Sequence, residues 1–118
     1  MSNKYHARKV MIDGITFDSQ AEGNRYLYLK SEQEAGRISG LECHPKFTLL
    51  KGRTWNGKRY RPVTYSPDFT YRDCVAAKMV AEDVKGGQAT QTTAFKIKQK
   101  MLIAMLDESA WDFRIVEA

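Results

Sequence analysis

Hydrophobic and polar positions alternate from Lys9 to Phe17, on both sides of the dipeptide Asp13-Gly14. A period of two residues is typical of a half-buried strand. Asp-Gly between two such runs is a strong signal for a tight two-residue turn. The pattern therefore predicts a β-hairpin at this end of the chain.

A helix is predicted over residues Gln20 to Ala35, because helix-forming residues fill this segment. Ser19 is a suitable N-cap, and Gly36 is placed where a left-handed residue commonly ends a helix. Gly23 is the one residue inside the segment that disfavours a helix. These local signals agree, so we expect the hairpin to be followed directly by a helix.

Three extended runs follow, and they cover Leu41 to Leu50, Tyr60 to Tyr71 and Lys78 to Lys85. Pro45 interrupts the first run and Pro67 interrupts the second, since proline cannot donate a hydrogen bond to a strand ladder. Asn56-Gly57 lies between these two runs and predicts the turn that joins them.

The last third of the chain predicts a second helix and a final strand. Gly86-Gly87 ends the third run, and a polar, Thr-rich loop leads to a helix from about Thr93 to Leu106. Apolar residues recur there with helical spacing, at Ala94, Ile97, Met101, Ala104 and Met105. Trp111 to Val116 alternates and predicts a strand. The order of hairpin, helix, three strands, helix and strand predicts a mixed α/β domain built on one sheet.

Composition limits the class of protein. A chain of 118 residues and 13.5 kDa suits one domain over residues 1–118. Its 42% of hydrophobic and 28% of charged residues are ordinary for a globular protein. No apolar run approaches the roughly 18 residues of a membrane span, and the first residues lack a secretory signal. Cys43 and Cys74 have no metal-site spacing and are predicted to be reduced, partly buried thiols. We therefore expect a cytoplasmic protein without a membrane partner.

The net charge of +5 is unevenly distributed. No acidic residue lies between Glu42 and Asp68, whereas the same stretch mixes cations with aromatic residues: Lys46, Lys51, Arg53, Lys58, Arg59 and Arg61 with Phe47, Trp55, Tyr60 and Tyr65. Cations neutralise phosphates and aromatic rings stack on bases, so the mixture suits a nucleic-acid surface. A basic hairpin with core-facing aromatic residues would give the same composition, and the sequence does not separate these two interpretations.

Two acids and a lysine form the candidate catalytic group. Asp68 follows Pro67, while Asp83 and Lys85 end the next run and share one face of it; Val84 points the other way. A surface ion pair would have the same spacing. Phosphodiester hydrolysis gives a more specific reason for these residue types, because Mg²⁺ binds carboxylate oxygens and lowers the pKa of a water that attacks the phosphate. The Val84 backbone carbonyl is a further candidate ligand, and Lys85 would neutralise charge on the reacting phosphate.

These motifs resemble the PD-(D/E)xK nuclease superfamily, and in particular small phage-encoded members that are identified as Holliday junction resolvases or are uncharacterised. The resemblance rests on Pro67-Asp68-Phe69 and Glu82-Asp83-Val84-Lys85-Gly86, with supporting segments at Asp13–Ser19, Pro45-Lys46-Phe47 and Tyr60-Arg61-Pro62. It implies a restriction-endonuclease-like fold, a mixed β-sheet flanked by helices. It also implies hydrolysis of DNA with Mg²⁺, for which Mn²⁺ can substitute.

The resemblance implies a further acid on the first helix, which here is Glu22. Ser19 and Glu22 also fit a capping box, in which the glutamate would only serve the helix terminus. Glu22, however, shares a helical face with the apolar Tyr26 and Leu29, which favours a position at the edge of the core. We expect Glu22 to contact the metal, with the capping role as the alternative.

Other polar residues are placed by the same arguments. Glu82 should face away from the site, although a shift of one residue in register would exchange it with Asp83. The second helix carries Lys96, Gln99 and Lys100 on one face, where superfamily members often place a residue near the scissile phosphate; a solvated helix face is the alternative. Nothing in the sequence pairs His6 or His44 with a ligand or a nucleophile, so neither is assigned a role.

The sequence thus predicts a metal-dependent endonuclease that binds DNA, with a branched four-way junction as the substrate implied by the resemblance. Symmetric incision of a junction needs two sites, which implies a homodimer. One alternative is another nuclease of the same fold, of the nicking, repair or restriction type. A second is a DNA-binding recombination accessory without catalysis, which would have no need to keep all of the acids and the lysine.

Overall fold

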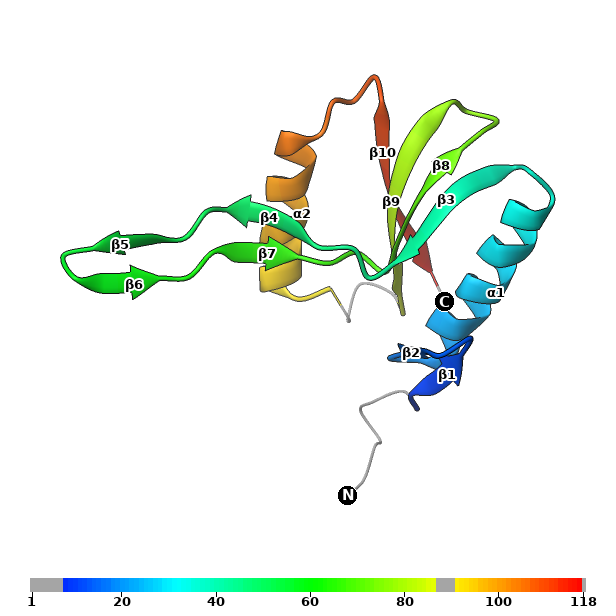
Figure 1. Ribbon diagram of the computed structural model, residues 1–118, viewed down its shortest axis with the longest axis horizontal. Helices are drawn as coiled ribbons and strands as arrows, with labels where there is room; N and C mark the ends of the chain where they lie inside the picture. Colours follow the sequence, from blue (N-terminus) through cyan, green and yellow to red (C-terminus); the bar gives the residue numbers. More distant parts are fainter. Residues whose placement is uncertain (1–7, 87–90, 118) are drawn as a thin grey trace.

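The computed structural model describes residues 8–86 and 91–117 (Figure 1). In chain order the elements are β1 (Val10–Ile12), β2 (Ile15–Phe17), α1 (Gln20–Glu34), β3 (Ile38–Cys43), β4 (Phe47–Leu50), β5 (Arg53–Trp55), β6 (Lys58–Tyr60), β7 (Val63–Tyr65), β8 (Phe69–Asp73), β9 (Lys78–Lys85), α2 (Thr93–Met105) and β10 (Trp111–Glu117). Gly87 and His6 lie outside the described residues.

A central sheet of four strands lies between the two helices, in the order β10-β9-β8-β3. β9 and β10 are parallel, whereas β8 is antiparallel to both β9 and β3. Neighbouring residues of β9 point to opposite faces: Val80 packs in the cluster on the α1 side, and Ala81 packs in the cluster on the α2 side. The predicted mixed α/β fold, with a sheet flanked by helices and an N-terminal hairpin, is confirmed.

The prediction of one sheet is wrong, because the strands of the described residues form four separate sheets. Pro45 and Pro67 separate β3 from β4 and β7 from β8, so the middle of the chain does not join the central sheet. β4 pairs with β7, and β5 pairs with β6, each in an antiparallel ladder. Together these two ladders form a long two-stranded projection, residues 47–65, which we call the arm (Figure 1).

Two-residue turns close the β1–β2 hairpin and the tip of the arm. Asp13 and Gly14 both adopt positive φ, 54° and 77°, as a tight turn between β1 and β2 requires. Asn56 and Gly57 do the same at the tip of the arm, with φ of 48° and 77°. Both predicted turns are confirmed.

Helix α1 begins and ends where its local signals indicate. The Ser19 hydroxyl accepts a hydrogen bond from the Glu22 backbone N–H at 3.1 Å, which caps the first turn. Gly36 adopts φ of 79° just after the helix. The β1–β2 hairpin packs on this helix and explains why residue 23 is a glycine. A Cβ at that position would lie 2.8 Å from the Val10 Cγ2 atom, so only glycine permits this close approach.

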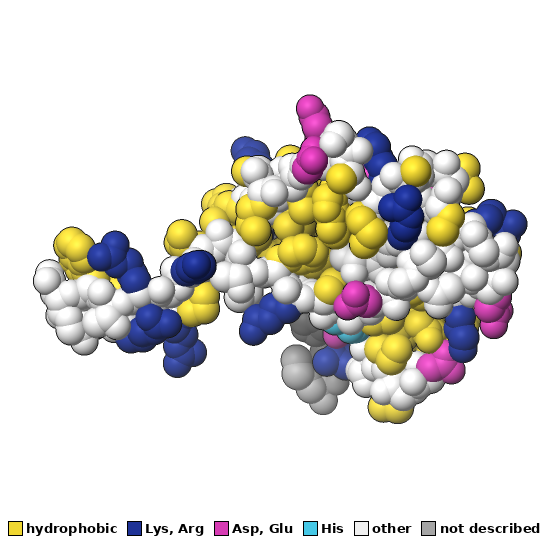
Figure 2. Space-filling view, turned by 45° about the horizontal axis from the view of Figure 1, so that its top comes forward, with side chains coloured by type: hydrophobic (Ala, Val, Ile, Leu, Met, Phe, Trp, Pro, Cys, Tyr) yellow, Lys and Arg dark blue, Asp and Glu magenta, His cyan; other side chains and the backbone are white. Residues whose placement is uncertain are grey.

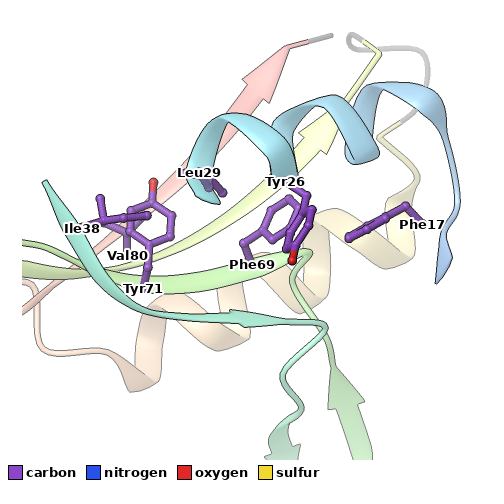
Figure 3. Packing of buried hydrophobic residues seen from close by; sticks show 7 residues of the cluster. All are labelled: Phe17, Tyr26, Leu29, Ile38, Phe69, Tyr71 and Val80. Atoms are coloured by element: carbon purple, nitrogen blue, oxygen red, sulfur yellow. The ribbon is translucent and has the colours of Figure 1, made fainter. Parts of the chain in front are cut away.

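The core consists of two clusters, one on each face of the central sheet. On the α1 side, buried aromatic and aliphatic residues interlock between the helix, the hairpin and the sheet (Figure 3): Phe17, Tyr26, Leu29, Ile38, Phe69, Tyr71 and Val80. On the α2 side the cluster contains Tyr65, Ala81, Phe95 and Leu102. Because Phe47 and Leu49 also pack against this second cluster, the base of the arm is attached to the body.

The second predicted helix is confirmed as α2, but the residues that it buries are not those of the predicted apolar stripe. Phe95 and Leu102 are buried, whereas Ile97 and Met105 are 53% and 54% exposed. Of the two thiols, both are free; Cys43 is half-buried as expected and Cys74 is exposed. Among the described residues, no helix is long and apolar enough to cross a membrane.

Candidate metal centre and nucleic-acid interface

Asp68 and Asp83 meet at the end of the β8–β9 ladder. The antiparallel register pairs Phe69 with Glu82, which brings the two aspartates side by side just beyond this pair. The Asp68 backbone N–H donates to Asp83 Oδ1 at 2.9 Å, and the Val84 N–H donates to Asp68 Oδ2 at 2.7 Å. Each aspartate is therefore held by the backbone of the neighbouring strand, which fixes the position of both carboxylates.

One oxygen of this pair has no partner. Asp83 is 3% exposed, and its Oδ2 atom makes no hydrogen bond within the described part of the chain. A buried carboxylate oxygen without a partner is energetically costly, because it has lost its hydration and gained nothing in exchange. A bound cation would supply the missing interaction.

Glu22 reaches this centre from the first turn of α1. Its backbone N–H is capped by Ser19, while its carboxylate Oε1 lies 3.2 Å from His44 Nε2. The side chain is thus directed to the cluster and is 6% exposed at the edge of the core. Of the predicted capping box only the Ser19 half is observed, since the hydroxyl accepts the Glu22 N–H. The Glu22 carboxylate lies beside His44, and its contact with a metal stays a prediction.

His44, to which the sequence analysis gave no role, is part of the cluster. One ligand-type atom from each of Glu22, His44 and Asp68 lies within 4.8 Å of the others. The expectation failed because His44 is distant in sequence from both acids, and the fold brings the three together. No local sequence motif predicts this contact.

Burial and repulsion between neighbouring carboxylates raise the pKa of Asp68 and of Asp83. Burial is the largest cause that raises the pKa of Asp68 to about 7; the Val84 N–H and Lys85 oppose the rise, and the charge of Glu22 adds to it. Burial also raises the pKa of Asp83, with Lys85 and the Asp68 N–H opposing and Glu22 reinforcing it. Carboxylates that resist ionisation in this way gain from a divalent cation, which would favour their charged forms.

Lys85 lies at the same end of β9. Its ammonium is 4.2 Å from the centroid of the Phe95 ring on α2, a cation–π contact. Its charge lowers the pKa of both Asp68 and Asp83, so it is close enough to influence them. The ammonium is thus held beside the acids by an aromatic ring and is not in a surface ion pair with any described residue.

Two predicted details of β9 can be compared with the structure. Glu82 faces away from the centre as predicted: its carboxylate accepts from Arg25 Nε at 2.7 Å and Nη2 at 3.0 Å, and from the Tyr71 hydroxyl. Val84 gives its N–H to Asp68, and its side chain packs in the α1-side cluster. Its carbonyl as a metal ligand stays a prediction.

The arm separates its aromatic residues into two groups. Phe47 and Tyr65 at the base belong to the core, whereas Trp55 and Tyr60 near the tip are 56% and 46% exposed. The alternative of core-facing aromatic residues therefore holds for the base and fails for the tip.

The outer arm presents cations beside these exposed rings. Register pairs Arg53 with Tyr60 and Trp55 with Lys58, so these four residues share one face of the β5–β6 ladder. The Arg53 guanidinium lies 4.9 Å from the Trp55 ring, and the Lys58 ammonium lies 5.1 Å from the Tyr60 ring. Lys51, Arg59 and Arg61 are exposed as well. Figure 2 shows Lys and Arg side chains along the arm and no acidic ones on the face in view.

The polar residues predicted on the second helix are less clearly placed. Lys96 and Lys100 are exposed and Gln99 is half-buried. Within the described ranges, no hydrogen bond or ion pair joins any of the three to the centre. Their approach to a phosphate stays a prediction.

The donors fit a divalent metal ion: Glu22, His44 and Asp68 each place one ligand-type atom within 4.8 Å of the others, and the adjacent Asp83 has a buried oxygen to which no described residue donates. Against known proteins, the model of one family, described as "Protein of unknown function (DUF1064)", matches residues 2–116, and the chain belongs to this family. No curated protein and no solved structure matches it.

Proposed function

We propose that this DUF1064 protein is a metal-dependent DNA endonuclease of the PD-(D/E)xK type. The acids of its site are Glu22, Asp68 and Asp83, and Lys85 is the cation beside the reacting phosphate. One observation carries the proposal. A half-buried aspartate, Asp68, and a buried one, Asp83, are held in place by each other's strands, and Asp83 Oδ2 accepts no hydrogen bond from the described residues and could bind a metal ion.

Each residue of the site has its own role in phosphodiester hydrolysis. Asp68 and Asp83 are the metal ligands that backbone N–H groups hold in place, and Glu22 reaches the site from helix α1. When bound, a divalent ion such as Mg²⁺ or Mn²⁺ polarises the phosphate and activates water. Lys85, which is held against Phe95, places a positive charge where the transition state gains negative charge.

The arm supports DNA as the substrate. Exposed cations along it contact phosphates, and they give affinity with little dependence on sequence. Exposed Trp55 near the tip offers a ring for bases that are unstacked, as they are at a branch point but not in a continuous duplex. This ring is our reason to favour branched DNA, a four-way junction, over linear duplex DNA.

We include a homodimer in the proposal, because paired incision of a junction requires two sites related by symmetry. Ile97, Ile103 and Met105 on α2 are each about half exposed, at 53%, 48% and 54%, and support a contact through this helix. Figure 2 shows hydrophobic side chains gathered on the body in the region of α2. Light scattering on wild type and Ile103→Lys would measure the mass, and a monomer in both would contradict this part of the proposal.

The decisive experiment incubates the protein with a four-way junction and with a linear duplex of matching sequence, in Mg²⁺, in Mn²⁺ and in EDTA. Wild type should cleave the junction only with metal, and Asp83→Asn should bind the junction without cleaving it. Asp73→Asn is the matched control, since Asp73 lies at the other end of β8 and should leave cleavage intact. Equal cleavage of both substrates would indicate a nicking, repair or restriction-type enzyme. Metal-independent binding without cleavage would indicate a recombination accessory, and full activity of Asp83→Asn would contradict the site.

A further inference from the structure

His44 occupies an unusual backbone position beside the metal centre. Its φ of 54° lies in the left-handed region. Non-glycine residues adopt this region at a cost on the order of 1 kcal/mol. Its N–H donates to the Asp68 carbonyl at 2.9 Å, and its ring lies 5.7 Å from the ring of Phe17. The backbone and the ring are therefore both held, and they direct the imidazole to the acids.

The distances suit shared coordination of one ion. His44 Nε2 and Glu22 Oε1 are 3.2 Å apart. That is close to the roughly 3 Å that separates adjacent ligands around an ion with bonds of about 2.1 Å. An Asp68 oxygen completes the group within 4.8 Å. Asp83 lies outside this group of three, but its Oδ1 atom accepts the Asp68 N–H, and its buried Oδ2 atom has no hydrogen-bond partner among the described residues, which is an independent sign that a cation binds beside Asp68.

We propose that His44 is a direct metal ligand together with Glu22 and Asp68, and that it makes the centre prefer Mn²⁺ to Mg²⁺. The preference follows from the donor type. Mg²⁺ favours an all-oxygen environment, whereas imidazole nitrogen suits first-row transition ions. The proposal rests on the metal centre of the proposed function and adds to it the ligand that selects the ion.

His44→Asn is the variant that tests this most sharply. Asparagine is among the few non-glycine residues that adopt positive φ readily, so the backbone at the base of the arm should be retained. Its amide offers an oxygen in place of the imidazole nitrogen. The chain has one other histidine, so His6→Asn is the matched control for a nitrogen ligand elsewhere.

Binding of Mn²⁺ and Mg²⁺ is measured by calorimetry on the DNA-free protein, and thermal melts verify that each variant is folded. Wild type should bind Mn²⁺ at least about tenfold more tightly than Mg²⁺. His44→Asn should lose about tenfold or more in Mn²⁺ affinity with little change for Mg²⁺, and His6→Asn should match wild type. In pulsed EPR of the Mn²⁺ complex, wild type should show coupling to a nitrogen nucleus, which His44→Asn should lack.

The different failures are distinguishable. If wild type binds Mn²⁺ and cleaves DNA, and His44→Asn keeps the same affinity with no nitrogen coupling in either protein, His44 only holds Glu22 and this inference is wrong. If nitrogen coupling from His44 is observed but no DNA is cleaved, the inference stands and the proposed function fails. If wild type binds neither ion, both are wrong.

Discussion

Replacing Asp68 with asparagine should make the metal-free protein more stable at pH 8, although the same replacement should abolish metal binding. The cause is the raised pKa of this carboxyl, which burial moves from 3.8 to about 7. Ionising Asp68 in the folded protein is therefore unfavourable when no cation is present. Asparagine removes the charge, and its Oδ1 atom can still accept the Val84 N–H that now bonds to Asp68 Oδ2 at 2.7 Å.

The sign and size follow from linkage. The folded state holds the Asp68 proton more tightly than the unfolded state, so the stability of wild type falls as the pH rises between about 4 and 7. At ~1.4 kcal/mol per unit, a rise from 3.8 to about 7 corresponds to an upper limit of about 4 kcal/mol. Glu22 and Asp83 keep their carboxyl groups in the variant, so we expect a net gain of about 2 kcal/mol at pH 8. For a domain of this size that is a rise of roughly 8 °C in Tm.

Urea titrations of wild type and Asp68→Asn in EDTA at pH 4.5 and pH 8 would measure this gain, which should largely disappear at the lower pH. Asp73→Asn is a control of opposite sign. Asp73 accepts N–H bonds from Val75 and Ala76 and pairs with Arg114, and these contacts lower its pKa, so its replacement should destabilise the protein at pH 8. Mn²⁺ should stabilise wild type but not Asp68→Asn. If Asp68→Asn is less stable than wild type at pH 8 in EDTA, Asp68 is a structural acceptor and the reasoning is refuted.

Four further predictions concern the proposed nuclease. Glu22→Gln should fold normally, since Ser19 retains the helix cap, yet lose cleavage; an active variant would leave Glu22 only a structural role. Lys85→Ala should reduce the single-turnover rate by about 10²-fold or more without weakening DNA binding, and an unchanged rate with weaker binding would make Lys85 a phosphate clamp. Trp55→Ala should weaken junction binding more than duplex binding, and equal losses would argue against a branch-point contact. Neutralising Lys58, Arg59 and Arg61 together should lower the log–log salt slope of DNA binding by about two to three units for both substrates. An unchanged slope would exclude these cations from the DNA surface.

The elements near the ends of the chain could be predicted because their signals are local. Asp13-Gly14, Ser19 and Gly36 each fix a backbone conformation from residues within one turn, and the structure has each where it was expected. The middle could not be predicted in the same way. Pro45 and Pro67 indicated that two runs are interrupted, but which strand pairs with which depends on contacts that are distant in sequence. The arm therefore emerged only from the pairing of β4 with β7 and of β5 with β6.

The second helix illustrates a different limit. Helical spacing of Ile97, Met101 and Met105 gave the correct element, because periodicity reports a helix whichever way it faces. The sequence could not tell which face the sheet would cover. The large ring of Phe95 and the side chain of Leu102 are the buried ones, and Phe95 also contacts Lys85. A residue outside the predicted stripe thus positions Lys85, the lysine of the proposed catalytic motif.

The acids and His44 show how the site and the arm are related. The arm begins at Phe47, shortly after His44, and ends at Tyr65, shortly before Asp68. The His44 N–H donates to the Asp68 carbonyl at 2.9 Å, which joins the two segments at this point. The base of the arm packs on the body through Phe47, whose ring meets that of Trp111 edge-on at 6.1 Å. A nucleic acid bound by the outer arm would therefore exert force on the same two backbone positions that place the proposed metal ligands. If the arm binds DNA as we propose, binding by the arm and the geometry of the centre would be linked through these two positions, one of which, His44, has a strained backbone.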